Sequence, residues 1–576
     1  MSADLARHNH TNNPEQAREI RAAIAARMIA LVPAVGHALA TDVRMDATIT
    51  LPERVLDEAA RAATVLLRTS TQPFGTAAWL DYHARFRARY GPGALVPVRE
   101  LVADSGLGYP AGYLGAPRAR PAWRALTDRD AALLALIQHA TLTGAREIDL
   151  TDTDIEALTV GEHADAVSPQ RIELGVELHA VSTAAIDRGE FRLRVTAAPH
   201  AHTSMAGRFA YLLAQADHAR LAATYAAPPA QSLADPNGPD TTGTGVVAVQ
   251  LSFPPRRPHN ENVVRVPPLL SDLVSLSEHP EPPGSVRPDL TVVGVNDLAV
   301  TADAEQMYLV QSSTGRRVIP RTPHALDTTA QSPPLARFLA EVADARSAVF
   351  RGFDLGAARV LPYVPRIRYR RTVLAAARWV LSNTDLTIKS GAHDVQEALR
   401  SWRQRMRVPA RVVLVHGELR LPLDLDQDLD RALLHARLER AGRVELHEDG
   451  PPDGQGWIGR PAELLIPMTA INPPARPLPA TTAPGTTLQP GAAAVVHAQL
   501  VGNPARFDEI LTAHLPRFVA ELHAPQDPDG LVESWWVRRH RDMILPETDQ
   551  HLAVFLRLTS PQHYGAIAAR LAALAA

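Results

Sequence analysis

The periodicity of the apolar residues changes near position 172, and this change constrains the fold more than any other feature of the sequence. Upstream, apolar residues recur every three or four positions, as in Ile20, Ile24 and Met28, which is typical of amphipathic helices. Downstream, apolar and polar residues alternate over short runs, beginning with IELGVELHAVS at 172–182, which is typical of strands with one covered face. Helical patterns return among these strands. We therefore expect an α+β fold in which mixed sheets pack against helices.

The expected elements are spread along the whole chain. Helices are predicted in two runs within 14–68, and at 79–90, 126–140, 205–222, 335–346, 506–522 and 563–573. Strands are predicted at 147–150 and in the later runs EFRLRVTAA, GVVAVQLSF, LTVVGVNDLAVTA, MYLVQSST, RRVIPRT, AVVHAQLVG, SWWVRRHR and HLAVFLRL. A stretch rich in Pro, Ala and Thr, 471–491, is expected to be a linker. It would separate a large region, 1–470, from a small α/β unit, 492–576.

The composition limits where the chain works and what it binds. The 576 residues include no cysteine, which excludes disulfides, thiolate catalysis and cysteine-ligated zinc. The formal net charge is -3, so any nucleic acid must be held by a local basic patch. No window has the roughly 18 uncharged apolar residues that a membrane span needs, and the polar N-terminus lacks an apolar signal segment. We expect a cytoplasmic protein without a membrane span.

Common catalytic motifs are absent from the sequence. There is no Gly-x-x-x-x-Gly-Lys phosphate loop, no His-Glu-x-x-His zinc helix and no Gly-x-Ser-x-Gly elbow. His200 and His202 would share one face of an extended segment and could hold a metal ion. The favoured alternative is that they only make a loop polar, because no second pair of ligands accompanies them. No metal and no bound cofactor are expected.

Arginines interleaved with aromatic residues mark the segment 361–379, LPYVPRIRYRRTVLAAARW. Guanidinium groups pair with phosphates and stack on flat rings, so this pattern suits a polyanion such as RNA. A second basic segment, WRQRMR, follows at 402–407. The alternative is a surface strand whose arginines are only solvated. The predicted tRNA-binding residues are Arg366, Arg368, Arg370, Arg371, Arg378, Arg403 and Arg405.

Two further segments carry arginines that suit an anion. Arg208, in SMAGRF at 204–209, is expected at a helix start, where backbone N–H groups would help it to hold an anion; an ion pair with a nearby carboxylate is the alternative. Arg256, Arg257 and Arg265 are candidates for gripping phosphates or a carboxylate bidentately. The aspartates between 424 and 430 could bind a divalent cation, but a solvated helix start is favoured.

The segment 81–110 adds a longer pattern: an aromatic-histidine helix, Arg-Tyr-Gly, Val-Pro, and then Asp104 ahead of Gly-Leu-Gly-Tyr-Pro. With Pro-Arg-Ile-Arg-Tyr and Arg-Trp at 365–379 and Gly-Arg-Phe at 207–209, it resembles the lantibiotic dehydratases from about residue 50 to residue 468. Those enzymes take glutamate from glutamyl-tRNA and place it on Ser or Thr of a precursor peptide. The resemblance implies a glutamylation region of several subdomains, with Asp104, Arg208, Arg257 and Arg265 as catalytic residues. Capping of the following turn is the alternative for Asp104.

The resemblance weakens at both ends. Beyond the expected linker, the chain resembles the opening of the family's elimination domain, but Ala553 and Phe555 stand where arginines are expected and only Arg557 remains. Near the start, the family's arginine-rich Arg-x-Thr-Pro-Phe-Gly segment has no counterpart, since STQPFG at 70–75 lacks the basic context. We therefore expect a glutamylation region truncated at its start and an elimination domain reduced to a stub.

The resemblance implies tRNA-dependent glutamylation of Ser or Thr, ahead of dehydration, in lantibiotic or thiopeptide biosynthesis. The expected partners are glutamyl-tRNA as co-substrate, the precursor peptide, and a protein that supplies the missing glutamylation segment or elimination domain. Two alternatives stay open. One is a non-catalytic component that binds tRNA or peptide, and the other is a peptide aminoacyl-tRNA ligase, which needs no elimination domain.

Overall fold

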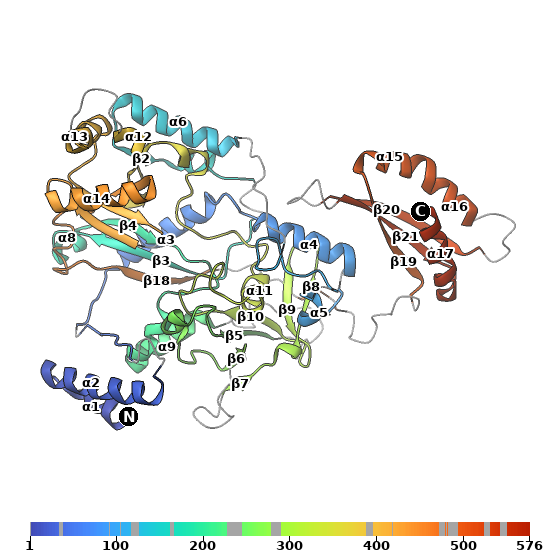
Figure 1. Ribbon diagram of the computed structural model, residues 1–576, viewed down its shortest axis with the longest axis horizontal. Helices are drawn as coiled ribbons and strands as arrows, with labels where there is room; N and C mark the ends of the chain where they lie inside the picture. The colour runs from blue at the N-terminus through green and yellow to red at the C-terminus, as the bar shows by residue number, and fades with distance from the viewer. Residues whose placement is uncertain are drawn as a thin grey trace.

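The computed structural model describes residues 2–33, 39–45, 47–91, 93–103, 105–116, 126–161, 166–226, 245–277, 290–386, 395–417, 419–471, 478–479, 481, 493–522, 530–541 and 550–575. Four sheets and the helices around them make up these residues, which confirms the α+β prediction (Figure 1). At the N-terminal end, α1 (Ser2–His10) and α2 (Pro14–Leu31) pack against each other.

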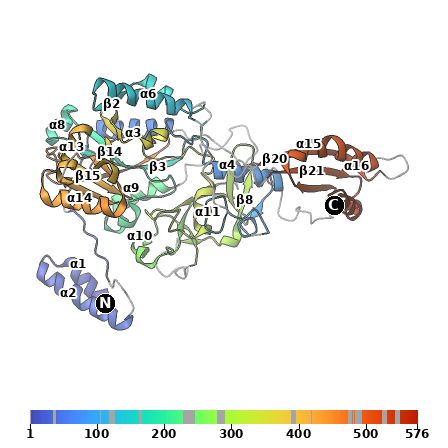
Figure 2. The ribbon, with the colours of Figure 1, turned by 45° about the horizontal axis from the view of Figure 1, so that its top comes forward.

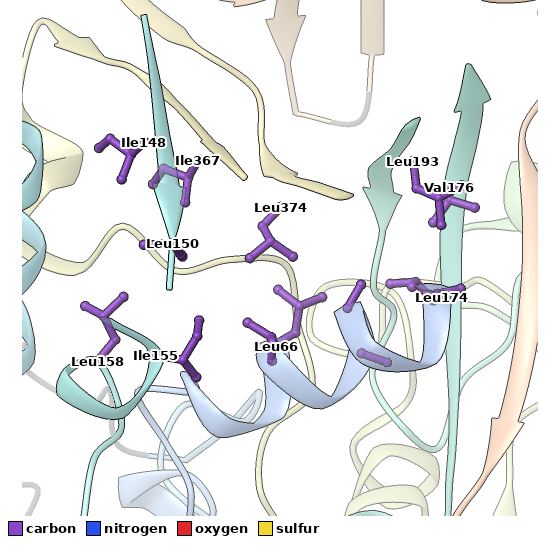
Figure 3. Packing of buried hydrophobic residues seen from close by; sticks show 14 of the residues in the cluster. Leu66, Ile148, Leu150, Ile155, Leu158, Leu174, Val176, Leu193, Ile367 and Leu374 are labelled. Atoms are coloured by element: carbon purple, nitrogen blue, oxygen red, sulfur yellow. The ribbon is translucent and has the colours of Figure 1, made fainter. Parts of the chain in front are cut away.

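A six-stranded mixed sheet has the strand order β18-β3-β4-β13-β12-β2. Its strands are β2 (Glu147–Leu150), β3 (Arg171–His179), β4 (Arg192–Ala197), β12 (Arg366–Tyr369), β13 (Thr372–Ala375) and β18 (Leu464–Thr469). The associated helices are α3 (Glu53–Arg68), α6 (Asp128–Thr143), α7 (Asp152–Ala157) and α8 (Thr183–Arg188). Figure 3 shows Leu66 of α3 packed with Ile155 and Leu374 in the buried cluster that joins these helices to the sheet.

Local sequence explains where α6 and α7 begin. The Thr127 hydroxyl accepts a hydrogen bond from the backbone N–H of Asp130, and the Asp130 carboxylate accepts one from the backbone N–H of Thr127. Thr151 and Asp154 make the same reciprocal pair at the start of α7. Such pairs satisfy N–H groups that have no partner within the helix. Local sequence therefore determines where these two helices begin.

A seven-stranded sheet has the strand order β1-β8-β9-β10-β5-β6-β7. Its strands are β1 (Val96–Pro97), β5 (Val246–Ser252), β6 (Asp272–Ser275), β7 (Thr291–Val292), β8 (Leu298–Ala302), β9 (Met307–Gln311) and β10 (Arg317–Arg321). The helices around it are α4 (Ala77–Tyr90), α5 (Val98–Leu101), α10 (Glu261–Val264) and α11 (Pro334–Val342), while α9 (Gln215–Tyr225) contacts β18 of the six-stranded sheet. Trp79 and Phe338 anchor α4 and α11 in a second buried cluster with β8 and β9.

A five-stranded sheet has the strand order β11-β14-β17-β15-β16. It contains β11 (Tyr363–Val364), β14 (Arg378–Ser382), β15 (Arg411–His416), β16 (Leu419–Asp424) and β17 (Arg443–Glu448), with α12 (Asn383–Leu386), α13 (Val395–Met406) and α14 (Asp428–Ala441) beside it. The predicted helix start in the aspartate run is confirmed, because α14 begins at Asp428. The arginine-aromatic segment 361–379 supplies strands to this sheet and to the six-stranded sheet, so it joins the two.

A three-stranded antiparallel sheet with the order β19-β21-β20 forms the C-terminal unit (Figures 1 and 2). It contains β19 (Val495–Val501), β20 (Val532–Arg541) and β21 (Gln550–Leu558), with α15 (Phe507–Glu509), α16 (Leu515–Leu522) and α17 (Tyr564–Ala575). Its buried cluster draws only on residues between Val496 and Leu571, which supports treating 492–576 as a separate unit. Most of the proposed linker, 471–491, lies outside the described residues, so the boundary at 470 stays a proposal.

The predicted helix at 205–222 is wrong in its extent. A short 3₁₀ helix, Gly207–Leu212, comes first, and α9 then starts at Gln215 after two extended residues. The start of this segment is constrained by packing: Gly207 lies so close to the turn after β10 that an added Cβ would be 1.9 Å from the backbone oxygen of Pro323. Periodicity along one segment carries no information about such an approach by another.

We expect Gly207→Ala to lower the free energy of unfolding by about 1 to 3 kcal/mol, because the new methyl group forces two backbone segments apart. Urea denaturation followed by tryptophan fluorescence would measure the change. Gly294→Ala is the matched control, since a Cβ at Gly294 meets nothing within 4 Å. Equal stability of the two variants would contradict the packing account.

Candidate functional site

A chamber of about 820 Å³ lies where the six-stranded and five-stranded sheets meet. β4 lines it from one sheet, and β15, β16 and β17 line it from the other. The connection between β13 and β14 and the segment 352–360 complete the lining. The chamber is thus placed by the same segment, 361–379, that joins the two sheets.

Five arginines line the chamber: Arg194, Arg359, Arg378, Arg420 and Arg443. The carboxylates in its lining are Glu445 and Glu448, so positive charge exceeds negative charge among its side chains. Such a lining suits an anion that brings several phosphate or carboxylate groups.

The arginines differ in how far their charge is already compensated. Arg378 is buried, and its Nε lies 2.9 Å from a carboxylate oxygen of Glu445. Arg420 donates to the backbone oxygen of Thr196 at 2.6 Å and makes no ion pair among the described residues, although its charge helps to lower the pKa of Glu177. Arg443 is exposed, and within the described part of the chain its guanidinium has neither a hydrogen bond nor an ion pair. Arg443 and Arg420 are therefore the arginines most available to a bound anion.

Glu445, in the lining of the chamber, has a fixed charge state. The ring of His447 lies 2.7 Å from its carboxylate and lowers its pKa most, burial opposes the shift, and Arg378 lowers it further. The resulting pKa of Glu445 is about 2. Glu445 is ionised at neutral pH and cannot donate a proton there, so its role is to orient Arg378 and His447.

A second chamber of about 780 Å³ adjoins the first. The two share the wall formed by residues 196–198 and by Arg420. Polar side chains in the second chamber include Thr203, Glu177 and Glu463, and the Thr196 hydroxyl donates to Glu463. A basic chamber and a mixed polar chamber thus lie side by side along one strand. This arrangement suits two substrates of different charge.

Arg366 and Arg368, predicted to bind tRNA, lie in an ion-pair network between β12, β2 and β17. Arg366 lies 2.8 Å from Glu448 and 2.8 Å from Glu147. Arg368 lies 2.7 Å from Glu147 and 2.8 Å from Asp149. These carboxylates compensate both charges, so their contact with tRNA stays a prediction that needs the network to open.

The other predicted tRNA-binding arginines are scattered. Arg378 lines the basic chamber, whereas Arg403 pairs with Asp426 at 3.0 Å. Arg370 is exposed in the turn between β12 and β13, with a φ of 51° and its guanidinium 5.4 Å from the Tyr369 ring. Arg371 donates to the backbone of Gly189 and Arg405 to the hydroxyl of Ser401; both are exposed. The structure does not gather these residues into one patch, and their role stays a prediction.

The predicted catalytic residues are also separated. Arg208 pairs with Asp42 at 2.6 Å, as the carboxylate alternative expected. Arg257 and Arg265 are exposed on either side of one short helical turn, and neither lines the two chambers. Asp104 lies outside the described residues. Their catalytic roles remain predictions.

The histidine pair in the HAH segment was expected to make a loop polar, and this is wrong for His202. Its ring is buried and stacks on His200 with centroids 5.7 Å apart, and burial lowers its pKa to about 3. Among the described residues, no group of three or more His, Cys, Asp or Glu is placed to hold a metal ion. None of the helices in the described part of the chain has the length and hydrophobicity that a membrane span requires.

Sequence reasoning missed four of the five arginines in the chamber lining: Arg194, Arg359, Arg420 and Arg443. Arg194 and Thr196 alternate within RLRVTA of β4, so the two-residue period of a strand could have placed them on one face. Arg443 stands at the start of β17 without any surrounding motif. Only the meeting of the two sheets makes it part of the chamber.

A family model and a curated protein match parts of this chain. The model described as "Lantibiotic dehydratase, N terminus" matches residues 1–434. The epidermin biosynthesis protein EpiB of Staphylococcus epidermidis is 22% identical over 156 residues, which are 27% of this chain and 15% of that protein.

Two solved proteins resemble the structure. The tRNA dependent lantibiotic dehydratase MibB from Microbispora sp. 107891 matches with a TM-score of 0.68 and 30% identity, over 91% of this chain and 49% of that chain. The glutamylation domain of TbtB, from thiomuracin biosynthesis, matches with a TM-score of 0.51 and 19% identity, over 81% of this chain and 57% of that chain. The protein thus spans about half the length of MibB. Because the family model covers well over half of its residues, the chain belongs to the lantibiotic dehydratase family.

Proposed function

We propose that the protein acts in the biosynthesis of a ribosomally made peptide by transferring glutamate from glutamyl-tRNA to Ser or Thr side chains, ahead of dehydration. Support comes from the likeness to the tRNA dependent dehydratase MibB, which extends over 91% of this chain. The observation that carries the proposal is the pair of adjoining chambers, one basic and one mixed polar, that share the wall at 196–198.

The basic chamber would receive the acceptor end of glutamyl-tRNA. Arg443 and Arg420 would pair with its phosphates or with the glutamate carboxylate, since both retain donors that no carboxylate among the described residues occupies. The second chamber would receive the peptide and bring its hydroxyl to the shared wall. The fixed negative charge of Glu445 would keep Arg378 in place while the anion binds.

The chemistry needs little beyond positioning. The hydroxyl oxygen of the peptide attacks the carbonyl carbon of the glutamyl ester, and the bond from that carbon to the tRNA ribose breaks. The proton released by the attacking hydroxyl is taken up by the ribose oxygen, which becomes a hydroxyl group again. Because the ester is already activated, holding the two reactants together supplies much of the acceleration. This is why arginines that bind and orient would suffice without a nucleophilic triad.

The test combines the purified protein, glutamyl-tRNA and a precursor peptide, with mass spectrometry as the readout. A peptide that gains one glutamyl group in an ester linkage is the expected product. A gain in an amide linkage at the peptide terminus would instead support the aminoacyl-tRNA ligase alternative. Binding of tRNA or peptide without any transfer would support a non-catalytic component.

Arg443→Glu is expected to weaken tRNA binding by about tenfold at low salt and to reduce the salt dependence of the binding constant by about one unit in slope. Loss of one phosphate contact and repulsion by the new carboxylate are the physical reasons. Fluorescence anisotropy across a salt series would measure both. Arg440→Glu makes the same charge change three residues earlier, on α14 and away from the chamber lining. If both variants bind equally, the basic chamber is not the tRNA site.

We propose further that elimination of glutamate is completed by a partner protein. Ala553 and Phe555 occupy β21 where the family resemblance leads us to expect arginines, so this strand keeps only Arg557 to hold a glutamyl group. Incubation with glutamyl-tRNA and peptide should therefore accumulate the glutamylated peptide. A dehydrated peptide formed by this protein alone would contradict the proposal.

A further inference from the structure

Three aromatic rings form a continuous stack across the C-terminal sheet. The rings of His497 and Phe555 have centroids 4.5 Å apart and planes that differ by 6°, and those of Phe555 and Trp536 are 5.2 Å apart and differ by 5°. The three residues face one another in the strand register, on β19, β21 and β20 in turn. The stack therefore runs across the three strands, and Trp536 on the edge strand β20 is the ring at one end.

This stack occupies the face of the sheet that its own helices leave uncovered. Leu552, Val554 and Leu556 alternate with the stacked ring of β21 and are buried with residues of α16 and α17. Residues of both helices belong to one buried cluster with these strand residues, so they pack on the same face of the sheet. The side chain of Trp536, on the opposite face, is 43% exposed. A large aromatic residue is thus displayed where burial in the sheet's own core does not require it.

The face that carries the stack is positively charged, and α4 lies beside its His497 end. Arg538 and Arg557 share this face with the stack, both are exposed, and neither has an ion-pair partner among the described residues. A cavity of about 170 Å³ beside the stack is lined by Arg85 and Arg89 of α4 as well as by Arg538, and the described residues that line it include no carboxylate.

A polar atom of the stack is left without a partner. Nε2 of His497 is inaccessible to solvent and makes no hydrogen bond in the described part of the chain. The ring also lines the basic cavity. A buried nitrogen of this kind is normally satisfied by a partner, so the packing of the His497 ring carries an energetic cost within the described residues.

We propose that this face binds a single-stranded segment of RNA, with one base continuing the ring stack on Trp536 and neighbouring phosphates paired with Arg538 and Arg557. A base of any identity can extend an aromatic stack, because every base has a flat face. Arginines beside the stack can pair with the phosphates of the RNA backbone. Duplex RNA is a poor ligand for such a site, since its bases are already stacked on one another. A peptide would match the rings but not the accumulated positive charge.

The identity of the RNA rests on the proposed function: it would be an unpaired loop of the same tRNA, held away from the acceptor end in the basic chamber. Binding of RNA to the stack does not itself depend on glutamyl transfer. Residues at this face would then raise the affinity for tRNA without touching the reacting atoms. They are binding residues and not catalytic ones.

The test titrates the full chain into a labelled single-stranded RNA oligonucleotide, uncharged by any amino acid, and follows anisotropy. We expect salt-dependent binding, and a loss of about tenfold or more in affinity for Trp536→Ala, because one base-stacking contact disappears. Leu429→Ala, which removes an exposed apolar side chain from α14, is the control for Trp536→Ala. Melting curves of each variant exclude loss of fold as the cause.

A second pair of variants tests the charge. Arg538→Ala should weaken binding and reduce its salt dependence, whereas Arg539→Ala should not. Arg539 is the next residue of β20, faces the helix side and pairs with Asp508. Equal effects of the two variants would overturn the proposed face.

Other outcomes are equally decisive. Duplex RNA that binds as tightly as the single strand, or a precursor peptide that binds the stack in place of RNA, would overturn the proposal. Glutamyl transfer to peptide with no oligonucleotide binding would overturn this site alone. Oligonucleotide binding that depends on Trp536, without any transfer, would establish the site and contradict the proposed function.

Discussion

Replacing Arg171 with methionine is expected to lower the free energy of unfolding by about 3 to 5 kcal/mol. Arg171 and Glu173 lie on the same face of β3, each is only 1% exposed, and their Nη2 and Oε1 atoms are 3.0 Å apart. Removing the guanidinium leaves a buried carboxylate without its counter-charge. The loss of packing over the Tyr225 ring, which lies 4.0 Å from the guanidinium carbon, adds to the effect. Urea denaturation followed by tryptophan fluorescence would measure the change.

Two variants serve as controls for this prediction. Arg188→Met removes a partner of Glu190 at the surface, where both side chains are more than half exposed, and should leave the midpoint unchanged. Combining Arg171→Met with Glu173→Gln removes the buried charge itself and should recover part of the lost stability. The amide oxygen can still accept a hydrogen bond from Ser204 or Met205, as Glu173 does. If Arg171→Met is as stable as Arg188→Met, the ion pair does not stabilise the sheet.

Acidification from pH 6.5 towards pH 4 is expected to destabilise the protein steeply. Burial lowers the pKa of His83 to about 4, of His202 to about 3 and of His324 to about 4, all from 6.5. The unfolded chain binds a proton at each histidine near pH 6.5, whereas the folded chain does not until the pH is much lower. Stability is therefore full above pH 6.5 and falls as the pH decreases. Three such groups together give a slope on the order of 4 kcal/mol per pH unit.

The pH prediction is checked by thermal or urea denaturation at intervals between pH 7 and pH 4.5. His324→Gln should reduce the slope by about one third, since a neutral amide takes up no proton in this range. His139→Gln changes an exposed histidine of α6 and should leave the slope as it is. A free energy of unfolding that stays constant from pH 7 to pH 5 would show that the three rings accept protons without unfolding.

The elements of the fold could be predicted where neighbours along the chain determine them. The alternation in IELGVELH predicts β3, and the three- and four-residue spacing after Pro334 predicts α11, because each pattern reports which face of the segment is covered. The capping pair Thr151 and Asp154 marks the start of α7 by an equally local interaction. The arrangement of these elements into four sheets depends on pairings between distant segments and was not predicted.

The site was predicted less well, because the free charge on an arginine depends on residues far away in the sequence. Arg366 looks like a tRNA-binding residue in its own segment, but Glu147 and Glu448 reach it from two other strands. Arg443 has no motif around it and is nevertheless left without a carboxylate partner among the described residues. Sequence patterns identify where arginines gather, and the pairing of strands then decides which of them remain available.

The order of strands also has a consequence for how the protein is made. β3 ends at His179, but β18, its partner on one edge, begins only at Leu464. A ribosome needs on the order of 15 to 60 s to add the residues between them. During that interval the edge of β3 has unpaired N–H and C=O groups and can recruit a strand from another nascent chain. Translation of this protein is therefore expected to depend on chaperones, and a version shortened to end before Leu464 should aggregate.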